Sequence, residues 1–270
     1  MPPPTSKPAN ELRLRIASAA VLLPVLIVCS WLGGWPFLAL LLVAVTLLAW
    51  EWHRLTGGGW EEIAVQAVAG IVALLAVFVG EPTWALLAIG LALALVAIVA
   101  WLRGRLTSWT VAGLPYLILP GLALLSLRSS PDAGRALIFW LFVVVIFADT
   151  GAYFAGRAIG GPKLAPGISP GKTWSGFVGG VVAAVVMGAI AAHLFAIGPG
   201  LLLAAVAALL AVVAPLGDLT ESWIKRRWQV KDSSGLIPGH GGILDRVDAV
   251  LFVAPIMWLT VRLGDGRFVW

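Results

Sequence analysis

The sequence has little charge, almost no cysteine and no long hydrophilic stretch. Only 11% of its 270 residues are Asp, Glu, Lys or Arg, whereas soluble domains carry roughly 25%. Because 60% of the residues are hydrophobic, a soluble core of this size cannot bury the apolar surface, and a lipid bilayer must cover the remainder. The single cysteine, Cys29, excludes an internal disulfide and a cysteine-based metal cage. These absences predict a single membrane domain.

Nine apolar stretches are long enough, or nearly so, to cross a bilayer as helices, which takes about 20 residues each. They are Ile16–Leu32, Pro36–Trp50, Ile63–Val79, Trp84–Leu102, Trp109–Leu127, Ala136–Ala155, Trp174–Ile197, Leu201–Gly217 and Ala249–Leu263. The predicted fold class is therefore all-α, a polytopic integral membrane protein with about nine transmembrane helices. Residues 1–15 are predicted to form an N-terminal tail and residues 16–270 a single membrane-embedded domain.

The distribution of basic residues predicts the orientation, because Lys and Arg are more frequent in cytoplasmic loops than in external ones. If the N-terminal tail is cytoplasmic, 14 of the 18 basic residues lie on the cytoplasmic side. The four on the other side are Arg128, Arg135, Arg262 and Arg267. We therefore expect a multi-pass protein whose two longest connections, 157–173 and 218–248, face the cytoplasm. The compactness of the chain favours a bacterial inner (plasma) membrane.

The second of these connections is unusually rich in charge, with 10 of the chain's 31 charged residues. A solvated basic loop that follows the positive-inside rule is one explanation. The order of the residues favours a site, because Asp218, Glu221 and Lys225 share one helix face, together with Ser222. Asp245 and Asp248 share a face where the last span begins. Between these helix ends lie glycines whose missing side chains allow a close approach to a ligand.

The residue types in this segment suit a metal-bound nucleotide. Three aspartates at two helix ends could converge on Mg²⁺, which takes carboxylate and phosphate oxygens. A polyphosphate could then be neutralised by Lys225, Arg226, Arg227, Lys231 and Arg246. Each acid alone could merely pair with a neighbouring Arg. Taken together, the acids and bases predict a metal–nucleotide site.

Two further residues have open interpretations. Asp149 lies deep in the sixth apolar stretch, where a charge is costly and functional by default. The alternative is that it caps a helix end at the membrane surface, with Gly151 and Gly156 closing that helix early. For His240, a phosphate-contacting or structural role is favoured over metal ligation, because Mg²⁺ prefers oxygen.

A long pattern runs through the second polar segment: Ser222-x-x-Lys225-Arg226-x(4)-Lys231-Asp232-x(2)-Gly235-x(2)-Pro238-Gly-His240-Gly241-Gly242-x(2)-Asp245-Arg246-x-Asp248. It resembles the signature of the phosphatidate cytidylyltransferases, also called CDP-diacylglycerol synthases. The earlier Lys163-Leu164-x-Pro166-x-Ile168-Ser169-Pro170-x-Lys172-Thr173-Trp174-x-Gly176 fits the same family. The motif similarity covers residues 149–248. The chain departs from the family at Ser175, where Glu is usual, and at Gly171, where Lys is common.

This resemblance implies an enzyme that transfers the cytidylyl group of CTP to phosphatidate, giving CDP-diacylglycerol and pyrophosphate. It also implies Mg²⁺, with a monovalent cation as an optional second ion, a homodimer, and no nucleic-acid partner. The expected metal ligands are Asp218, Asp245 and Asp248, which with Lys225 and Arg246 form the catalytic set. The expected substrate-binding residues are Ser169, Lys172, Thr173, Ser222, Arg226, Lys231, His240, Gly241 and Gly242.

Two rival functions fit parts of the sequence. A CTP-dependent polyprenol or phytol kinase-like enzyme would share membrane embedding and nucleotide use, but the completeness of the signature argues against it. An ion-coupled transporter could use Asp149, Asp218 and Asp245 as an ion relay. Transporters of that kind often contain inverted repeats with broken helices, and the N-terminal half has no counterpart of the C-terminal motif.

Overall fold

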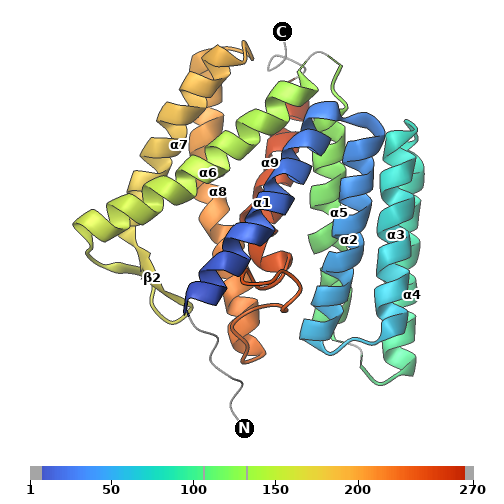
Figure 1. Ribbon diagram of the computed structural model, residues 1–270. Coiled ribbons are helices and arrows are strands. Elements are labelled where there is room, and N and C mark those ends of the chain that lie inside the picture. Colours follow the sequence, from blue (N-terminus) through green and yellow to red (C-terminus); the bar gives the residue numbers. More distant parts are fainter. Residues whose placement is uncertain (1–7, 106, 132, 265–270) are drawn as a thin grey trace.

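The computed structural model describes residues 8–264 except 106 and 132, so Arg267 and the first seven residues of the predicted tail lie outside the described residues. Within this part, the chain forms nine helices and one hairpin (Figure 1). The elements are α1 Pro8–Leu32, α2 Gly34–Thr56, α3 Trp60–Phe78, α4 Pro82–Leu102, α5 Ser108–Arg128, α6 Gly134–Ile159, β1 Lys163–Ala165, β2 Ser169–Thr173, α7 Trp174–Leu194, α8 Gly200–Arg227 and α9 Leu244–Leu263. Eight helices, α1 to α8, are long and apolar enough to cross a membrane. The predicted all-α membrane fold is confirmed.

Several boundaries differ from the prediction. Helix α1 begins at Pro8, so residues 8–15 are helical and not a tail. Helix α8 continues ten residues beyond the predicted end at Gly217, because the polar residues that follow keep a helical spacing. The connection 157–173 contains the antiparallel hairpin of β1 and β2, in which Lys163 pairs with Thr173.

Helices α6 and α7 pack closely through glycines. A Cβ atom on Gly179 would lie 2.2 Å from the Cβ of Ala155, and one on Gly180 would lie 2.6 Å from the Ala148 carbonyl oxygen. On the α6 side, a Cβ on Gly151 would lie 2.5 Å from the Cβ of Ala183. Small residues let membrane helices approach in this way. Helix α6 runs on to Ile159. The alternative interpretation, in which Gly151 and Gly156 close this helix early, is wrong.

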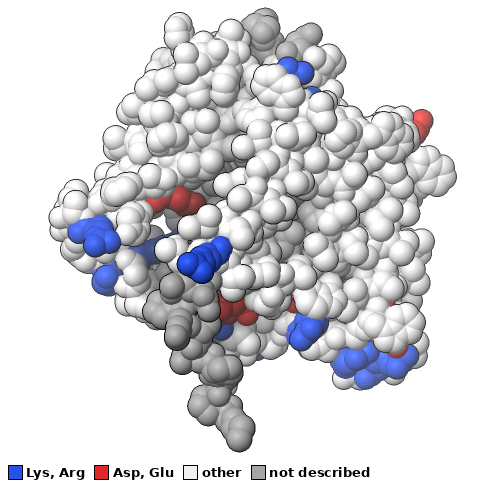
Figure 2. Space-filling model, in the orientation of Figure 1, with Lys and Arg blue, Asp and Glu red and all other residues white. Residues whose placement is uncertain are grey.

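The polar segments gather at one end of the molecule. In Figure 1, α2 to α5 stand side by side at the right and α7 and α8 at the left. Helix α1 runs obliquely between these two groups, in front of α9. The hairpin and the α8–α9 loop lie at the lower end, where α1 begins. Figure 2 shows charged side chains mainly around this lower end, whereas the broad middle of the face is uncharged. The fold thus brings both predicted motif segments to the same side of the apolar body.

Candidate active site

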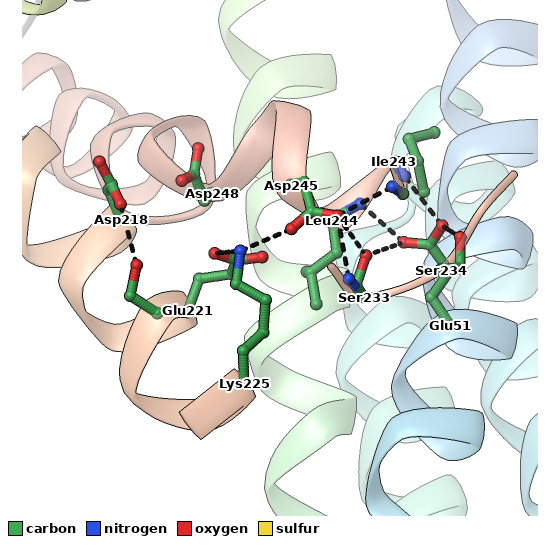
Figure 3. A network of polar contacts seen from close by, with 12 residues as sticks. Glu51, Asp218, Glu221, Lys225, Ser233, Ser234, Ile243, Leu244, Asp245 and Asp248 are labelled. Atoms are coloured by element: carbon green, nitrogen blue, oxygen red, sulfur yellow. Dashed lines mark hydrogen bonds and ion pairs between the residues drawn. The ribbon is translucent and has the colours of Figure 1, made fainter. Parts of the chain in front are cut away.

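One face of α8 carries a row of interacting polar side chains. Ser222 Oγ donates a hydrogen bond to Asp218 Oδ1 at 3.3 Å, and Lys225 Nζ lies 2.6 Å from Glu221 Oε2 (Figure 3). The pairs are four residues apart, which places their side chains one above the other on a helix. The shared face predicted from the sequence is confirmed.

Lys225 joins α8 to α9. Its Nζ lies 2.6 Å from Asp245 Oδ1 as well as 2.6 Å from Glu221 Oε2. The side chains are 14% exposed for Lys225, 2% for Glu221 and 5% for Asp245, so the ion pairs are largely shielded from water. Because both of its short contacts are to carboxylates, Lys225 supports the arrangement of acids, and its contact with a substrate phosphate stays a prediction.

Asp245 is held from both sides. Its Oδ2 accepts hydrogen bonds from Ser233 N and Ser233 Oγ, each at 3.0 Å, and from Gly242 N at 2.8 Å. Burial alone would raise the pKa of Asp245, but hydrogen bonds with Glu221, Lys225 and two backbone N–H groups outweigh it and lower that pKa. The carboxylate at the start of α9 is therefore kept ionised and in a fixed orientation.

Asp218 and Asp248 form a second pair of acids. Figure 3 shows their carboxylates side by side and turned in the same direction. A Cβ on Gly217 would lie 2.4 Å from the Asp248 carbonyl oxygen, so glycine allows α8 and α9 to meet at this point. Burial and the neighbouring Asp218 carboxylate raise the pKa of Asp248 to about 7. A cation bound at this pair would favour the ionised form of Asp248, which burial and the charge of Asp218 disfavour.

Lys172 of β2 forms an ion pair with Asp218. The family resemblance implies that Lys172 binds a substrate, and in the structure Lys172 already has a partner from α8. A hairpin lysine and a helix aspartate 46 residues apart in the sequence, by their numbering, are brought together only by the fold.

A cavity of about 590 Å³ opens beside this ion pair. It lies between α6, the hairpin, α7 and α8, and its charged lining residues are Asp149, Arg157, Lys163, Lys172 and Asp218. Figure 2 shows a hollow near the hairpin with acidic side chains inside it and basic ones at its rim. Asp149 therefore faces the cavity from within α6 and does not cap a helix end.

An apolar groove of about 820 Å³ runs along α6 and α7. Along α7 its lining includes Trp174, Val178, Val182 and Val186. The three valines are four residues apart and more than half exposed, so they form one stripe along the helix. The groove and the cavity are both built on α6 and α7, but they have no lining residue in common.

The other predicted residues of the hairpin differ in their surroundings. Thr173 lines the cavity but its Oγ1 also accepts a hydrogen bond from Gly176 N at 3.1 Å, which caps α7. Ser175, the departure from the family, donates to the carbonyl of Gly160 and so ties α7 to the end of α6. Ser169 lies in β2 and is not part of the cavity lining.

The glycine segment before α9 is held by α1. His240 Nδ1 lies 2.7 Å from Ser18 Oγ, and Arg15 Nε donates to the Gly239 carbonyl at 3.0 Å. Gly241 has a φ of 84°, which L side chains rarely adopt. These contacts favour a structural role for His240. Three cations of the predicted site are exposed and have no ion pair among the described residues: Arg226, Lys231 and Arg246.

Comparison with known proteins identifies the family. The sequence model of the Cytidylyltransferase family matches residues 13–263. The chain belongs to this family. It is 39% identical over 262 residues to the phosphatidate cytidylyltransferase of Brucella suis, covering 93% of each chain. The enzyme of the same name from Pseudomonas aeruginosa is 39% identical, with 91% of this chain and 95% of the relative covered. The one from Bacillus subtilis is 43% identical over 140 residues, 52% of each.

Family membership extends the resemblance beyond the motif region to nearly the whole chain.

The acids of the site can be compared with the ligands that Mg²⁺ prefers. Among the described residues, no three His, Cys, Asp or Glu side chains come close enough to hold a metal ion. Mg²⁺ is usually bound by only one or two carboxylates, with substrate phosphates and water as its other ligands. Asp218 lines the cavity and its carboxylate lies beside that of Asp248, so two carboxylates are available to a cation. The donor set therefore fits a hard cation that arrives with a phosphate substrate.

Sequence reasoning missed one residue near this site. Glu51 of α2 is fully buried and accepts hydrogen bonds from the α8–α9 loop. A local signal existed, because Glu51 stands between Trp50 and Trp52 at the end of an apolar stretch. Its partners could not be known, since they follow almost two hundred residues later.

Proposed function

We propose that this protein transfers the cytidylyl group of CTP to phosphatidate, giving CDP-diacylglycerol and pyrophosphate. The observation that carries the proposal is a charged cavity in the wall of an otherwise apolar body. The cavity is lined by Asp218, Lys172 and Asp149, and two of its helices, α6 and α7, also line an apolar groove. A lipid with a phosphate headgroup needs a charged surface and an apolar one. Relatives that cover nearly the whole chain are named for this activity.

The proposed placement of the lipid uses both surfaces. The phosphate of phosphatidate would lie in the cavity near Lys172, Arg157 and Lys163, which can neutralise it. An acyl chain would follow the stripe of Val178, Val182 and Val186 into the bilayer. CTP would approach from the side of the α8–α9 loop. Its triphosphate would be held by the remaining predicted contacts, which are Ser169, Thr173, Ser222, Arg226, Lys231, Gly241, Gly242 and Arg246, while His240 holds the glycine segment against α1.

The chemistry requires positioning and charge neutralisation more than a strong base. An oxygen of the lipid phosphate attacks the α-phosphorus of CTP, the bond from that phosphorus to the β-phosphate oxygen breaks, and pyrophosphate leaves. Asp218 and Asp248 would hold Mg²⁺, with Asp245 proposed as a further ligand, and the bound ion would supply positive charge to the triphosphate and the leaving group. Lys225 keeps Asp245 ionised and in place, and Lys172 is proposed to exchange Asp218 for a substrate phosphate.

The orientation and assembly are part of the same proposal. We infer that the end with the hairpin and the α8–α9 loop faces the cytoplasm of the inner membrane, where CTP is present. The support is the excess of Lys and Arg at this end. A homodimer is proposed from the family resemblance alone.

The test is an assay of the purified protein in detergent with labelled CTP and phosphatidate. The proposal predicts pyrophosphate release that depends on the lipid, with one labelled CDP-diacylglycerol formed for each pyrophosphate. Phosphorylation of a polyprenol or phytol with CTP would favour the kinase-like alternative. If a protein with a cooperative thermal transition shows neither activity, both enzyme functions are contradicted. The ion-coupled transporter is then the remaining hypothesis.

A further inference from the structure

A buried glutamate from α2 binds the loop that carries the glycine motif. Glu51 is fully buried, and its two carboxylate oxygens accept four hydrogen bonds (Figure 3). Two donors come from within the loop, Ser233 Oγ at 3.1 Å and Ser234 Oγ at 2.5 Å. The other two come from the start of α9, Ile243 N at 2.8 Å and Leu244 N at 2.7 Å. One carboxylate thus ties the middle of the segment between α8 and α9 to the start of α9.

The same carboxylate caps α9. The first N–H groups of a helix have no partner within the helix, and the residue before α9, Ile243, has no side chain that can accept a hydrogen bond. Glu51 satisfies two of these N–H groups from a different helix, and a negative charge is also favoured at this end of the helix dipole. Asp245 is the next residue after the capped pair. The direction in which α9 starts, and so the place of Asp245, depends on Glu51.

A second connection from Glu51 to Asp245 runs through one hydroxyl. Ser233 Oγ lies 3.1 Å from Glu51 Oε2 and 3.0 Å from Asp245 Oδ2, so it stands between the two carboxylates. Ser233 also donates its backbone N–H to Asp245 at 3.0 Å. Gly242 is matched to this arrangement, because a Cβ there would lie 1.9 Å from Ser233 Oγ and 2.7 Å from Glu51 Oε1. The glycine motif and the glutamate of α2 fit together as one unit.

We propose that Glu51 is a positioning residue for the active site, which holds the start of α9 and Ser233 so that Asp245 keeps its orientation toward Lys225 and the cation. Glu51 is fully buried and both of its oxygens accept hydrogen bonds from the loop and the start of α9, so it acts through Asp245 and not on a substrate. This inference rests on the proposed function, because it assigns to Asp245 a role in binding the cation used with CTP.

The test is Glu51→Gln, which keeps the shape of the side chain but replaces one acceptor oxygen with an N–H donor that faces other donors. We expect the Mg²⁺ concentration for half-maximal activity to rise about tenfold or more, as for other residues that orient metal ligands. Without substrates, the rise in melting temperature that Mg²⁺ produces should move to higher Mg²⁺ by a similar factor. This second readout does not depend on turnover.

Glu62→Gln is the matched control. Glu62 is also fully buried and accepts a hydrogen bond from a helix-start backbone group, Gly59 N, at 2.9 Å, but it pairs with Arg105 and has no contact with the α8–α9 loop. It should lower the melting temperature without changing the Mg²⁺ midpoint. The same pattern in Glu51→Gln, a lower melting temperature with a wild-type Mg²⁺ midpoint, would reduce Glu51 to a structural role and overturn the inference.

Ser233→Ala gives a milder version of the same test and replaces Glu51→Gln if that variant does not fold. It should raise the Mg²⁺ midpoint in the same direction. Combined with Glu51→Gln, it should add little, because residues in one chain of contacts are not additive. An unchanged midpoint in Ser233→Ala would contradict the inference. A wild-type protein without lipid-dependent pyrophosphate release would instead contradict the proposed function, while the melting experiment would still decide the role of Glu51.

Discussion

Replacing Lys225 with methionine should cost much of the stability of the fold, because this lysine is the only cation between two buried carboxylates in the described contacts. Its Nζ lies 2.6 Å from both Glu221 Oε2 and Asp245 Oδ1. Asp245 keeps three other hydrogen bonds without it. Glu221 loses its ion pair, and its other oxygen, Oε1, is already buried without a hydrogen-bond partner. Lys225→Met therefore leaves one buried charge uncompensated, which costs about 3–5 kcal/mol when a buried ion pair is broken from one side.

The assay is thermal or denaturant unfolding of the purified protein in one detergent, with activity normalised to the folded fraction. Adding Glu221→Gln to Lys225→Met should recover a large part of the loss, because the uncompensated charge is removed. A coupling free energy of about 1–3 kcal/mol between the two positions is expected. If Lys225→Met unfolds like the wild type yet loses its activity, the lysine serves a substrate and not the ion pairs, and the reasoning fails.

Three further predictions concern topology, the hairpin and helix packing. In a Cys29→Ser background, a cysteine placed at the exposed Gly235 should react with an impermeant thiol reagent only after the cells are opened, and labelling of intact cells would reverse the orientation. Lys172→Ala should lower turnover strongly with little change in melting temperature, whereas activity within about twofold of wild type, about 0.4 kcal/mol of barrier, would remove its proposed phosphate contact. Gly179→Ala should lower the free energy of unfolding by about 1–3 kcal/mol through overpacking against α6. Gly90→Ala is the control and should not lower it, because a Cβ there would meet no atom within 4 Å. Equal stabilities of the two variants would contradict the close α6–α7 packing.

Local patterns in the sequence predicted the helices and part of the site. Hydropathy located the nine helices of the described part of the chain, eight of which are long and apolar enough to cross a membrane, because a membrane span must satisfy its own backbone hydrogen bonds and be apolar along its length. The spacing of Asp218, Glu221, Ser222 and Lys225 predicted their shared face, because a helix fixes which neighbours meet. The interpretation of the α6 glycines as a helix end was wrong, because these glycines allow close contact with α7.

The contacts between distant segments could not be predicted in this way. Lys172 meets Asp218, and Glu51 meets the start of α9, only because the helices fold against one another. No spacing carries that information. The pairing of Asp218 with Asp248, with Asp245 turned toward Lys225, likewise depends on where α8 and α9 meet at Gly217.

The most direct test of the account is a Mg²⁺ titration of cytidylyl transfer for the wild type and for Asp218→Asn, Asp245→Asn and Asp248→Asn in the same detergent. Asn keeps nearly the same shape but removes the charge that a hard cation requires. The account predicts no detectable transfer for Asp218→Asn and Asp245→Asn, and a severe loss for Asp248→Asn that high Mg²⁺ partly reverses. An excess of chelator should abolish the wild-type activity. Wild-type activity in excess chelator, or full activity of Asp245→Asn at ordinary Mg²⁺, would contradict the proposed site even though the chain belongs to the family.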